Sequence, residues 1–248
     1  MEIIPAEYYS TIYLLFITLL SFFAFREYTL YDEQRFFGNG SSNIKGVVIL
    51  DIMIALFIGL RPISGFEFVD MGGYAESYRM FYGTQFQWNW ETDNKIFDNL
   101  IWWMASMQFD IYTFFVFLAL MYFTGMAVAC IMLFPKDRLA SFLVCLAAFS
   151  TFSYGTNGMK AGLAASFFLV ALAFNERKLK WWTIIFLLIS WGFHHAMQLP
   201  VAAFVVCKIV KDPKYYLWFW LFCFFMAVLH VSYFMHIFEG MTDEQGSS

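Results

Sequence analysis

Long apolar runs constrain the fold of this chain more than any single motif does. Eight of them recur between charged residues, at 8–25, 46–60, 111–134, 139–153, 158–174, 181–191, 195–207 and 215–238. A helix needs about 20 apolar residues to cross a bilayer core. Only 14% of the residues are charged, against about 25% in soluble domains. The sequence therefore predicts an all-α, polytopic integral membrane protein with about eight transmembrane helices, some of them short or re-entrant.

One long polar and aromatic loop interrupts this pattern, at residues 61–110. Within it, residues 94–109 carry Phe97, Ile101 and Met104 at helical spacing, which predicts an interfacial helix. We expect residues 1–240 to form a single transmembrane helical domain that includes this loop. Residues 241–248 are expected to be a disordered tail.

Basic residues alternate between the connecting loops and predict the orientation of the chain. Eleven of the 15 Lys and Arg residues fall in the first, third, fifth and seventh loops. The positive-inside rule places such loops in the cytoplasm. The N- and C-termini and the long loop 61–110 are therefore predicted to lie outside.

The segment 181–207 is too short for two full crossings, because it has only 27 residues. A single crossing would put the lysines at 208–214 outside, which the charge rule disfavours. We therefore predict a short hairpin, with Gly192 as the flexible residue of its bend. His194 and His195 then lie roughly 20 Å from the cytoplasmic edge of the core, at 1.5 Å per residue.

Lys160 stands at the head of another apolar segment, about one turn inside the predicted outer boundary. A charge at that depth is tolerated where it is buried in protein or lines a wet cavity. The alternative is that its long side chain reaches up to the surface. Small residues that follow it, such as Gly162 and Ser166, would let neighbouring helices pack closely around it.

Polar side chains from three outer segments are predicted to converge on a cavity open to the outer face. Arg61 could instead reach the lipid headgroups, and Asp70 and Glu67 could be solvated surface. Tyr74 and Tyr78 lie on one helical face, where packing contacts compete with sugar stacking. The histidine pair could be a satisfied turn. The converging set is Arg61, Glu67, Asp70, Asn157, Lys160, His194 and His195.

This set of side chains suits group transfer from a phosphate-activated donor. Cationic Arg and Lys side chains neutralise a diphosphate and help it to leave. A histidine can take the proton of an attacking hydroxyl, and a carboxylate can orient that histidine or act as the base. The four cysteines form no close pair, so a metal site is not expected. The net charge of −4 gives no case for nucleic-acid binding.

Three stretches resemble motifs of the EpsG-like, Wzy-type bacterial polysaccharide repeat-unit polymerases. Residues 59–82 resemble the first outer loop of that family, in which an Arg ends a helix and is followed by a Gly, an Asp and spaced tyrosines. The matching residues are Arg61, Gly65, Asp70, Tyr74 and Tyr78.

The other two stretches lie further along the chain. Residues 156–172 resemble the family's Asn-x-x-Arg-Gln-x-x-Ala helix start, through Asn157 and Ala164, with Lys160 and Ala161 in place of the Arg-Gln pair. Residues 192–200 resemble its His-Ser-Ala motif, in which His195 is the better match. Lys for Arg is not a neutral change at a bidentate phosphate site.

The resemblance implies a metal-independent enzyme without a cofactor, in the bacterial cytoplasmic membrane. It would join undecaprenyl-diphosphate-linked oligosaccharide repeats at the outer face by glycosyl transfer. Its partners would be the lipid-linked donor and acceptor, membrane lipids and other polysaccharide export or chain-length proteins. Two alternatives stay open: a transferase that adds a single sugar, with Glu67 and Asp70 as its acids, and a non-enzymatic transporter or assembly subunit.

The resemblance also suggests a role for each candidate residue. Arg61 and Lys160 would hold the diphosphate, and Asn157 would orient nearby groups. His195 or Asp70 would serve the acceptor hydroxyl. The remaining candidates are His194 for catalysis and Glu67, Tyr74 and Tyr78 for substrate binding.

Overall fold

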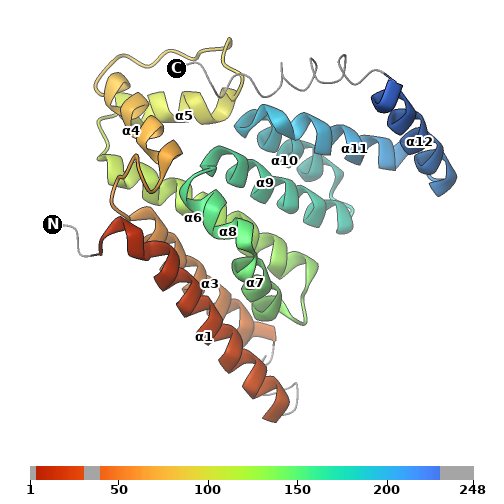
Figure 1. The fold of residues 1–248 in the computed structure, drawn as a ribbon, viewed down its shortest axis with the longest axis horizontal. Coiled ribbons are helices and arrows are strands. Elements are labelled where there is room, and N and C mark those ends of the chain that lie inside the picture. Colours follow the sequence, from red (N-terminus) through yellow and green to blue (C-terminus); the bar gives the residue numbers. More distant parts are fainter. Residues whose placement is uncertain (1–3, 31–39, 230–248) are drawn as a thin grey trace. The chain divides into compact units, whose positions relative to one another are not determined.

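The computed structural model describes residues 4–30 and 40–229, which form two compact units divided between His195 and Ala196. The described residues are helical and contain no strand (Figure 1). The predicted tail at 241–248, and the part of the last apolar segment beyond residue 229, lie outside the described residues.

Nine α-helices and one short 3-10 helix, η1, make up the described part of the first unit. Each predicted apolar segment of this unit is helical over nearly all of its length. The elements are η1 (Ala6–Tyr8), α1 (Tyr9–Leu30), α3 (Gly40–Gly59), α4 (Val69–Phe81), α5 (Lys95–Ser106), α6 (Ile111–Leu133), α7 (Arg138–Ala147), α8 (Phe149–Thr156), α9 (Met159–Glu176) and α10 (Lys180–Phe193).

Helix α6 is the centre of this unit, because α3 and α9 both pack along it and α10 packs on α9. Its first turn is capped by the side chain of Asp110, which accepts a hydrogen bond from the backbone N–H of Tyr112 at 2.9 Å. Helix α3 crosses it closely at Gly59, where an added Cβ would lie 2.5 Å from Cα of Val116. Small residues permit such close crossings between apolar helices.

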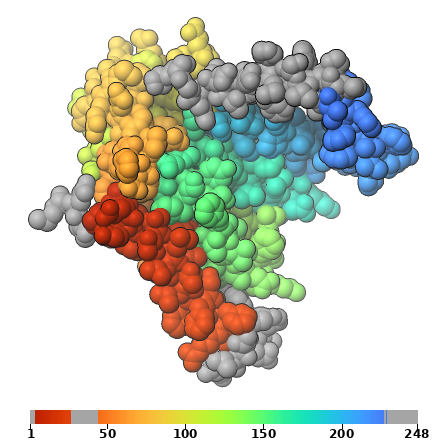
Figure 2. All heavy atoms as spheres, viewed as in Figure 1, coloured from red at the N-terminus to blue at the C-terminus, as the bar shows by residue number. Residues whose placement is uncertain are grey.

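Helices α7 and α8 form one apolar path that bends by 72°. The break falls at Ala148, whose backbone is extended (φ −63°, ψ 131°). Helix α1 packs on α7, and the hydroxyl of Tyr13 donates to the carbonyl of Leu146 at 2.7 Å. Figure 2 shows the red atoms of α1 bordering the green atoms of this bent pair.

The predicted outer loop contains two helices, α4 and α5, which pack on each other. Helix α5 confirms that residues 94–109 contain a helix, and the predicted apolar face of Phe97, Ile101 and Met104 is buried within the protein. The buried Asn99 of α5 holds the preceding loop, since its amide exchanges two 2.8 Å hydrogen bonds with the backbone of Asn89. These contacts fix the chain just before the start of α5.

The predicted number of about eight membrane spans is not confirmed. Among the described residues, three helical stretches are long and apolar enough to cross a membrane: Ala6–Arg26, Ile111–Leu133 and Met159–Glu176. The bent pair α7–α8 would make a fourth. The segment predicted as a short hairpin forms two apolar helices that are each too short for a full crossing, Lys180–Phe193 and His195–Ile209.

The second unit contains two described helices, α11 (Gln198–Ile209) and α12 (Pro213–Leu229), after the short 3-10 turn η2 (His195–Met197). Their connection is held by an ion pair between Lys214 and Asp212 at 2.8 Å and by a hydrogen bond from the hydroxyl of Tyr216 to the carbonyl of Val210. The many exposed aromatic side chains of α12 suit a lipid environment.

Candidate functional site

The histidine pair lies where helix α10 ends. The helix continues through Gly192 and stops at Phe193, and His194 turns the chain into an extended conformation (φ −151°, ψ 123°). The predicted bend at Gly192 is therefore wrong, and the break falls at His194. The end of α10 is fixed to α9, because the buried hydroxyl of Ser190 donates to the carbonyl of Ala164 at 2.7 Å.

One side-chain amide holds both histidines. Oδ1 of Asn94 lies 3.0 Å from Nδ1 of His194 and 3.4 Å from Nδ1 of His195, and it accepts the backbone N–H of His195 at 3.1 Å. Asn94 is buried, at 7% exposed, and immediately precedes α5. The two imidazole rings meet edge to face, with their centroids 4.9 Å apart. The long loop and the end of α10 thus form one cluster.

Gly192 permits this meeting in a different way from the one predicted. A Cβ at this position would lie 2.6 Å from Cδ1 of Ile96 on α5. Glycine therefore lets α10 approach the first turn of α5, and the histidines that follow reach Asn94. Gly192 acts through its small size rather than through its flexibility.

Lys160 lies in the first turn of α9 and is half-buried. Its charge acts electrostatically on both His194 and Asp98, so the three groups are neighbours. Burial raises the pKa of the Asp98 carboxyl, while Lys160 and the backbone amide of Asn94 lower it. Within the described parts of the chain, Lys160 makes no ion pair within 4 Å and no hydrogen bond through its amine.

Asp70 and Tyr74 border this cluster on α4. Asp70 is exposed in the first turn of that helix, and the ring of Tyr74 packs on Phe97 of α5 with centroids 5.0 Å apart. Burial raises the pKa of Tyr74, and the carboxylates of Asp70 and Asp98 raise it further. The phenol therefore stays neutral between two acids. Glu67 is exposed in the turn before α4, where its backbone N–H donates to the hydroxyl of Ser64 at 3.0 Å.

Arg61 has no exposed surface at all. Its guanidinium donates to the carbonyl of Ile58, at the end of α3, at 2.5 Å and to that of Thr156, at the end of α8, at 2.6 Å. The rings of Phe68 and Phe115 lie 5.1 and 5.8 Å from Cζ. A cation is favourable at the negative end of a helix dipole. Arg61 therefore joins two helix ends and fixes the turn that precedes Lys160.

Asn157 lies in that same turn, at the end of α8. Its backbone N–H donates to the carbonyl of Ser153 at 2.8 Å, and its own carbonyl accepts from Met159 at 2.6 Å. Its side-chain Oδ1 is buried without a hydrogen-bond partner. Buried polar atoms usually find a partner, so this oxygen is an available acceptor beside the start of α9.

The sequence also matches a known protein family. The family model described as the EpsG family matches residues 47–245. The chain belongs to the EpsG family. No curated protein and no solved structure matches it. Membership in the EpsG family points to a polysaccharide-polymerase type of role, and together with the apolar helices it indicates a membrane protein.

The family match confirms the resemblance that the sequence motifs indicated, and residues 47–245 include all three of those stretches. Of the predicted site residues in this EpsG-family chain, the structure brings together Lys160 and the two histidines, with Asp70 and Tyr74 at their border. Asn157 lies in the α8–α9 turn that precedes Lys160, and Arg61, from the connection after α3, bonds to the carbonyl of Thr156 at the start of that turn.

Tyr78 lies apart from the cluster, in the core beneath α4. It is 1% exposed, its hydroxyl donates to the carbonyl of Phe109 at 2.9 Å, and its ring packs on Phe114 with centroids 5.0 Å apart. Burial, together with Tyr82 and Asp110, raises the pKa of Tyr78 to about 12. In this structure the side chain serves packing, and it has no free face on which a sugar could stack.

Sequence reasoning missed Asn94 and Asp98. Asn94 has the type and position of a helix N-cap, but its side chain makes no cap hydrogen bond and is used for the histidines instead. Asp98 follows one turn later, and the charge of Lys160 lowers the pKa of its carboxyl group. The available signal was the amide immediately before an amphipathic helix that carries an acid on its polar side. No group of three metal-ligating side chains occurs at 4–30 or 40–229.

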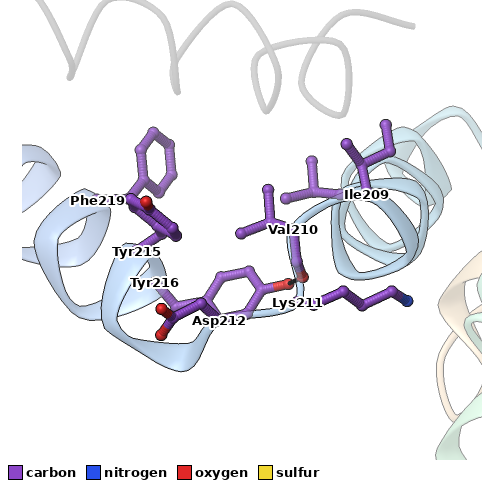
Figure 3. Close-up of a pocket in the computed structure, with 8 residues that line it drawn as sticks. Ile209, Val210, Lys211, Asp212, Tyr215, Tyr216 and Phe219 are labelled. Atoms are coloured by element: carbon purple, nitrogen blue, oxygen red, sulfur yellow. Dashed lines mark hydrogen bonds between the residues drawn. The ribbon is translucent and has the colours of Figure 1, made fainter.

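A pocket in the second unit is a separate feature. It encloses about 740 Å³ between the end of α11 and the start of α12 and is lined by Ile209, Val210, Lys211, Tyr215 and Phe219, among others (Figure 3). Its wall is mostly apolar, and it contains none of the predicted site residues. The predicted site residues all belong to the first unit.

Proposed function

We propose that this EpsG-family protein joins undecaprenyl-diphosphate-linked oligosaccharide repeats by glycosyl transfer at the outer face of the cytoplasmic membrane. The observation that carries the proposal is the cluster of Lys160, His194, His195 and Asp98 at one end of the first unit. It combines a cation without an ion pair among the described residues, two imidazoles and a carboxyl group. These are the groups that transfer from a lipid diphosphate requires.

The reaction moves one glycosyl group. A hydroxyl oxygen of the acceptor sugar attacks the anomeric carbon of the donor, and a new C–O bond forms. The bond between that carbon and the diphosphate oxygen breaks, so the lipid diphosphate leaves with the bonding electron pair. The hydroxyl proton passes to a histidine nitrogen. Neither oxidation nor reduction occurs.

Lys160 is the proposed diphosphate contact, because it is half-exposed and its amine has no partner among the described residues. Arg61 is fully buried and bound to two helix ends. We assign it to holding the turn that presents Lys160 and Asn157, and its direct contact with a diphosphate would require that turn to open. Asp70 and Glu67 are exposed and suit contacts with sugar hydroxyls, and the ring of Tyr74 packs on Phe97 of α5.

Complementation tests the proposal. A bacterium lacking its own copy receives the wild-type protein or His194→Gln, His195→Gln and Lys160→Gln variants, and the polymer ladder is measured. General-base catalysis contributes about 100-fold to 10,000-fold, so loss of the operating histidine should collapse the ladder. Protein level in the membrane is the control. An unchanged ladder in the double His194→Gln, His195→Gln variant would overturn the proposal.

The products separate the alternatives. A ladder of repeats identifies a polymerase, whereas one added sugar identifies a single-sugar transferase. Retained binding of lipid-linked sugar without turnover by the purified protein identifies a transporter or an assembly subunit. The broken helix at His194 is compatible with that last class, since discontinuous helices also form transport sites.

A further inference from the structure

The orientation of the Asn94 amide is fixed by a backbone group. The two ends of an asparagine amide are hard to tell apart by shape, and their assignment depends on the hydrogen-bond network. The backbone N–H of His195 can only donate, and it lies 3.1 Å from the Asn94 side chain. The atom that faces it must accept, so it is Oδ1 and not Nδ2.

This orientation determines where His194 carries its proton. Oδ1 of Asn94 lies 3.0 Å from Nδ1 of His194 and can only accept. Nδ1 must therefore bear the hydrogen in that contact. In a neutral imidazole the other nitrogen is then unprotonated. Nε2 of His194 is left with a free lone pair, and no group in the described residues donates to it.

His195 is held less firmly by the same oxygen. Its Nδ1 lies at 3.4 Å, and a carbonyl oxygen has two lone pairs, which the shorter contacts at 3.0 and 3.1 Å already occupy. The backbone of His195 is fixed, but its ring is not fixed to one tautomer. The two adjacent histidines thus differ: the tautomer of His194 is fixed by a hydrogen bond, whereas that of His195 is not.

We infer that Asn94 is a positioning residue that holds His194 with its proton on Nδ1 and presents Nε2 as the proton acceptor. This inference rests on the proposed function for its catalytic meaning. It assigns the base to His194, although the sequence motif favoured His195. The lone pair would receive the hydroxyl proton of the acceptor sugar as the glycosidic bond forms.

The surroundings of Asn94 support a role beyond capping α5. It is 7% exposed, although it belongs to a long outer loop, and its side chain leaves the helix terminus unbonded. The charged and titratable groups that act on His194 are His195 and Lys160, and Asp98 lies beside Lys160. Only the Asn94 amide makes a direct hydrogen bond to the His194 ring within the described chain.

The test is nitrogen NMR of the full-length protein in detergent micelles, with ¹⁵N-labelled histidine. A His194→Gln variant identifies the His194 signals among those of the four histidines. In wild type at neutral pH, Nδ1 of His194 should show the shift of a protonated nitrogen and Nε2 that of an unprotonated one. The reverse pattern, or an even mixture of tautomers, would overturn the inference.

Two substitutions of Asn94 separate positioning from folding. Asn94→Asp keeps an accepting oxygen and should retain the tautomer and at least a tenth of the polymer yield. Asn94→Leu removes it and should lose both the tautomer and about 100-fold of the yield. The matched control is Asn175→Leu, in the last turn of α9 and at the opposite end of that helix from Lys160. It should change neither the His194 tautomer nor the polymer yield. An Asn94→Leu variant that folds and keeps the wild-type tautomer would contradict the inference.

The NMR pattern also separates this inference from the proposed function. It is measured without substrate, so the tautomer can be established even if the protein makes no polymer. If instead His194→Gln abolishes polymer while the wild-type ring carries its proton on Nε2, the proposed function survives and the role of Asn94 does not.

Discussion

Two helix ends of the first unit contrast sharply, although both place polar side chains in apolar surroundings. At the junction of α3 and α8, Arg61 is completely buried, and its guanidinium bonds to carbonyls of both helices. At the end of α10, His194 and His195 are half-buried and share one amide oxygen, with the amine of Lys160 nearby. The first junction is closed, and the second leaves reactive atoms available.

The contrast shows that depth in an apolar chain does not by itself identify a reactive residue. Arg61 and Lys160 are equally unusual in sequence, and both were predicted to bind the diphosphate. What separates them is how many of their donors the fold already uses: Arg61 bonds to two helix-end carbonyls, whereas no described residue occupies the Lys160 amine. We therefore expect substitutions at the two positions to affect different properties.

The largest effect is expected on stability, at Arg61. Arg61→Leu leaves two helix-end carbonyls without their donor, which should lower the free energy of unfolding by on the order of 3 kcal/mol. Arg61→Lys should lose about half of that, because one amine cannot span both carbonyls in the same planar geometry. The midpoint of thermal unfolding in detergent measures both changes.

Arg79 provides the matched control for Arg61. It is exposed in the last turn of α4, so Arg79→Leu should change stability by less than about 0.5 kcal/mol. If Arg61→Leu unfolds at the same temperature as Arg79→Leu, the buried guanidinium does not hold the two helix ends together. The distinction between this junction and the end of α10 would then be wrong.

The next effect is expected on activity, at Lys160. Lys160→Gln should reduce polymer yield by about 10-fold to 100-fold, the equivalent of a charged hydrogen bond of about 1.5–3 kcal/mol, while the unfolding midpoint stays near that of wild type. Lys160→Arg should retain more activity than Lys160→Gln, because a guanidinium keeps the charge and also binds phosphate, although the two cations are not equivalent at a bidentate site. Polymer ladders from membranes with equal protein levels give the comparison.

Lys95 is the control for this substitution. It is an exposed lysine at the start of α5, and its amine donates to the carbonyl of Thr92 at 3.0 Å. Lys95→Gln should leave the ladder unchanged. An active Lys160→Gln variant would show that the free amine at the open helix end does not contact substrate.

Most helices were predictable from the sequence, because their apolar runs and flanking charges have only one stable solution in a bilayer. The bend within 139–156 and the number of true spans were not predictable. Phe149 follows Ala148 with no proline or glycine to indicate that the helix would turn by 72°. Such a break depends on packing between distant segments, as in the contact from Tyr13 to Leu146.

The site was predictable where a residue type was unusual for its surroundings, as with Lys160 and the histidine pair. Asn94 and Asp98 were not predictable, because polar residues are common in a polar loop and nothing in the sequence distinguishes these two from solvated surface residues. Their meaning comes from α5 packing on the end of α10, which depends on the close contact between Gly192 and Ile96. Arg61 stood out in the sequence, but sequence alone could not reveal that it is fully buried and bonded to two helix-end carbonyls.

That close contact offers a way to break the open helix end without touching a polar residue. Gly192→Val places new atoms where Cδ1 of Ile96 already lies within 2.6 Å of the Cβ position, and such overpacking costs about 1–3 kcal/mol. The same change should separate His194 from Asn94. Adding Ile96→Ala should recover most of the stability and the histidine contact. Gly73→Val is the control, because nothing lies within 4 Å of a Cβ at Gly73.

The smallest effect is expected in the pH dependence of stability, through Asp98. Burial raises the pKa of Asp98 in the folded protein above its ordinary value of 3.8. Between the pKa of the unfolded chain and the higher pKa of the folded protein, the folded protein binds more protons. The free energy of unfolding should therefore fall as pH rises through that window, and Asp98→Asn should remove the slope. Lys160→Gln removes the cation that lowers this pKa, so the slope should extend to higher pH. The measurement is the unfolding midpoint from about pH 4 to about pH 8, with Glu76→Gln, at an exposed position, as the control. If Lys160→Gln leaves the wild-type slope in place, the charge of Lys160 does not act on Asp98.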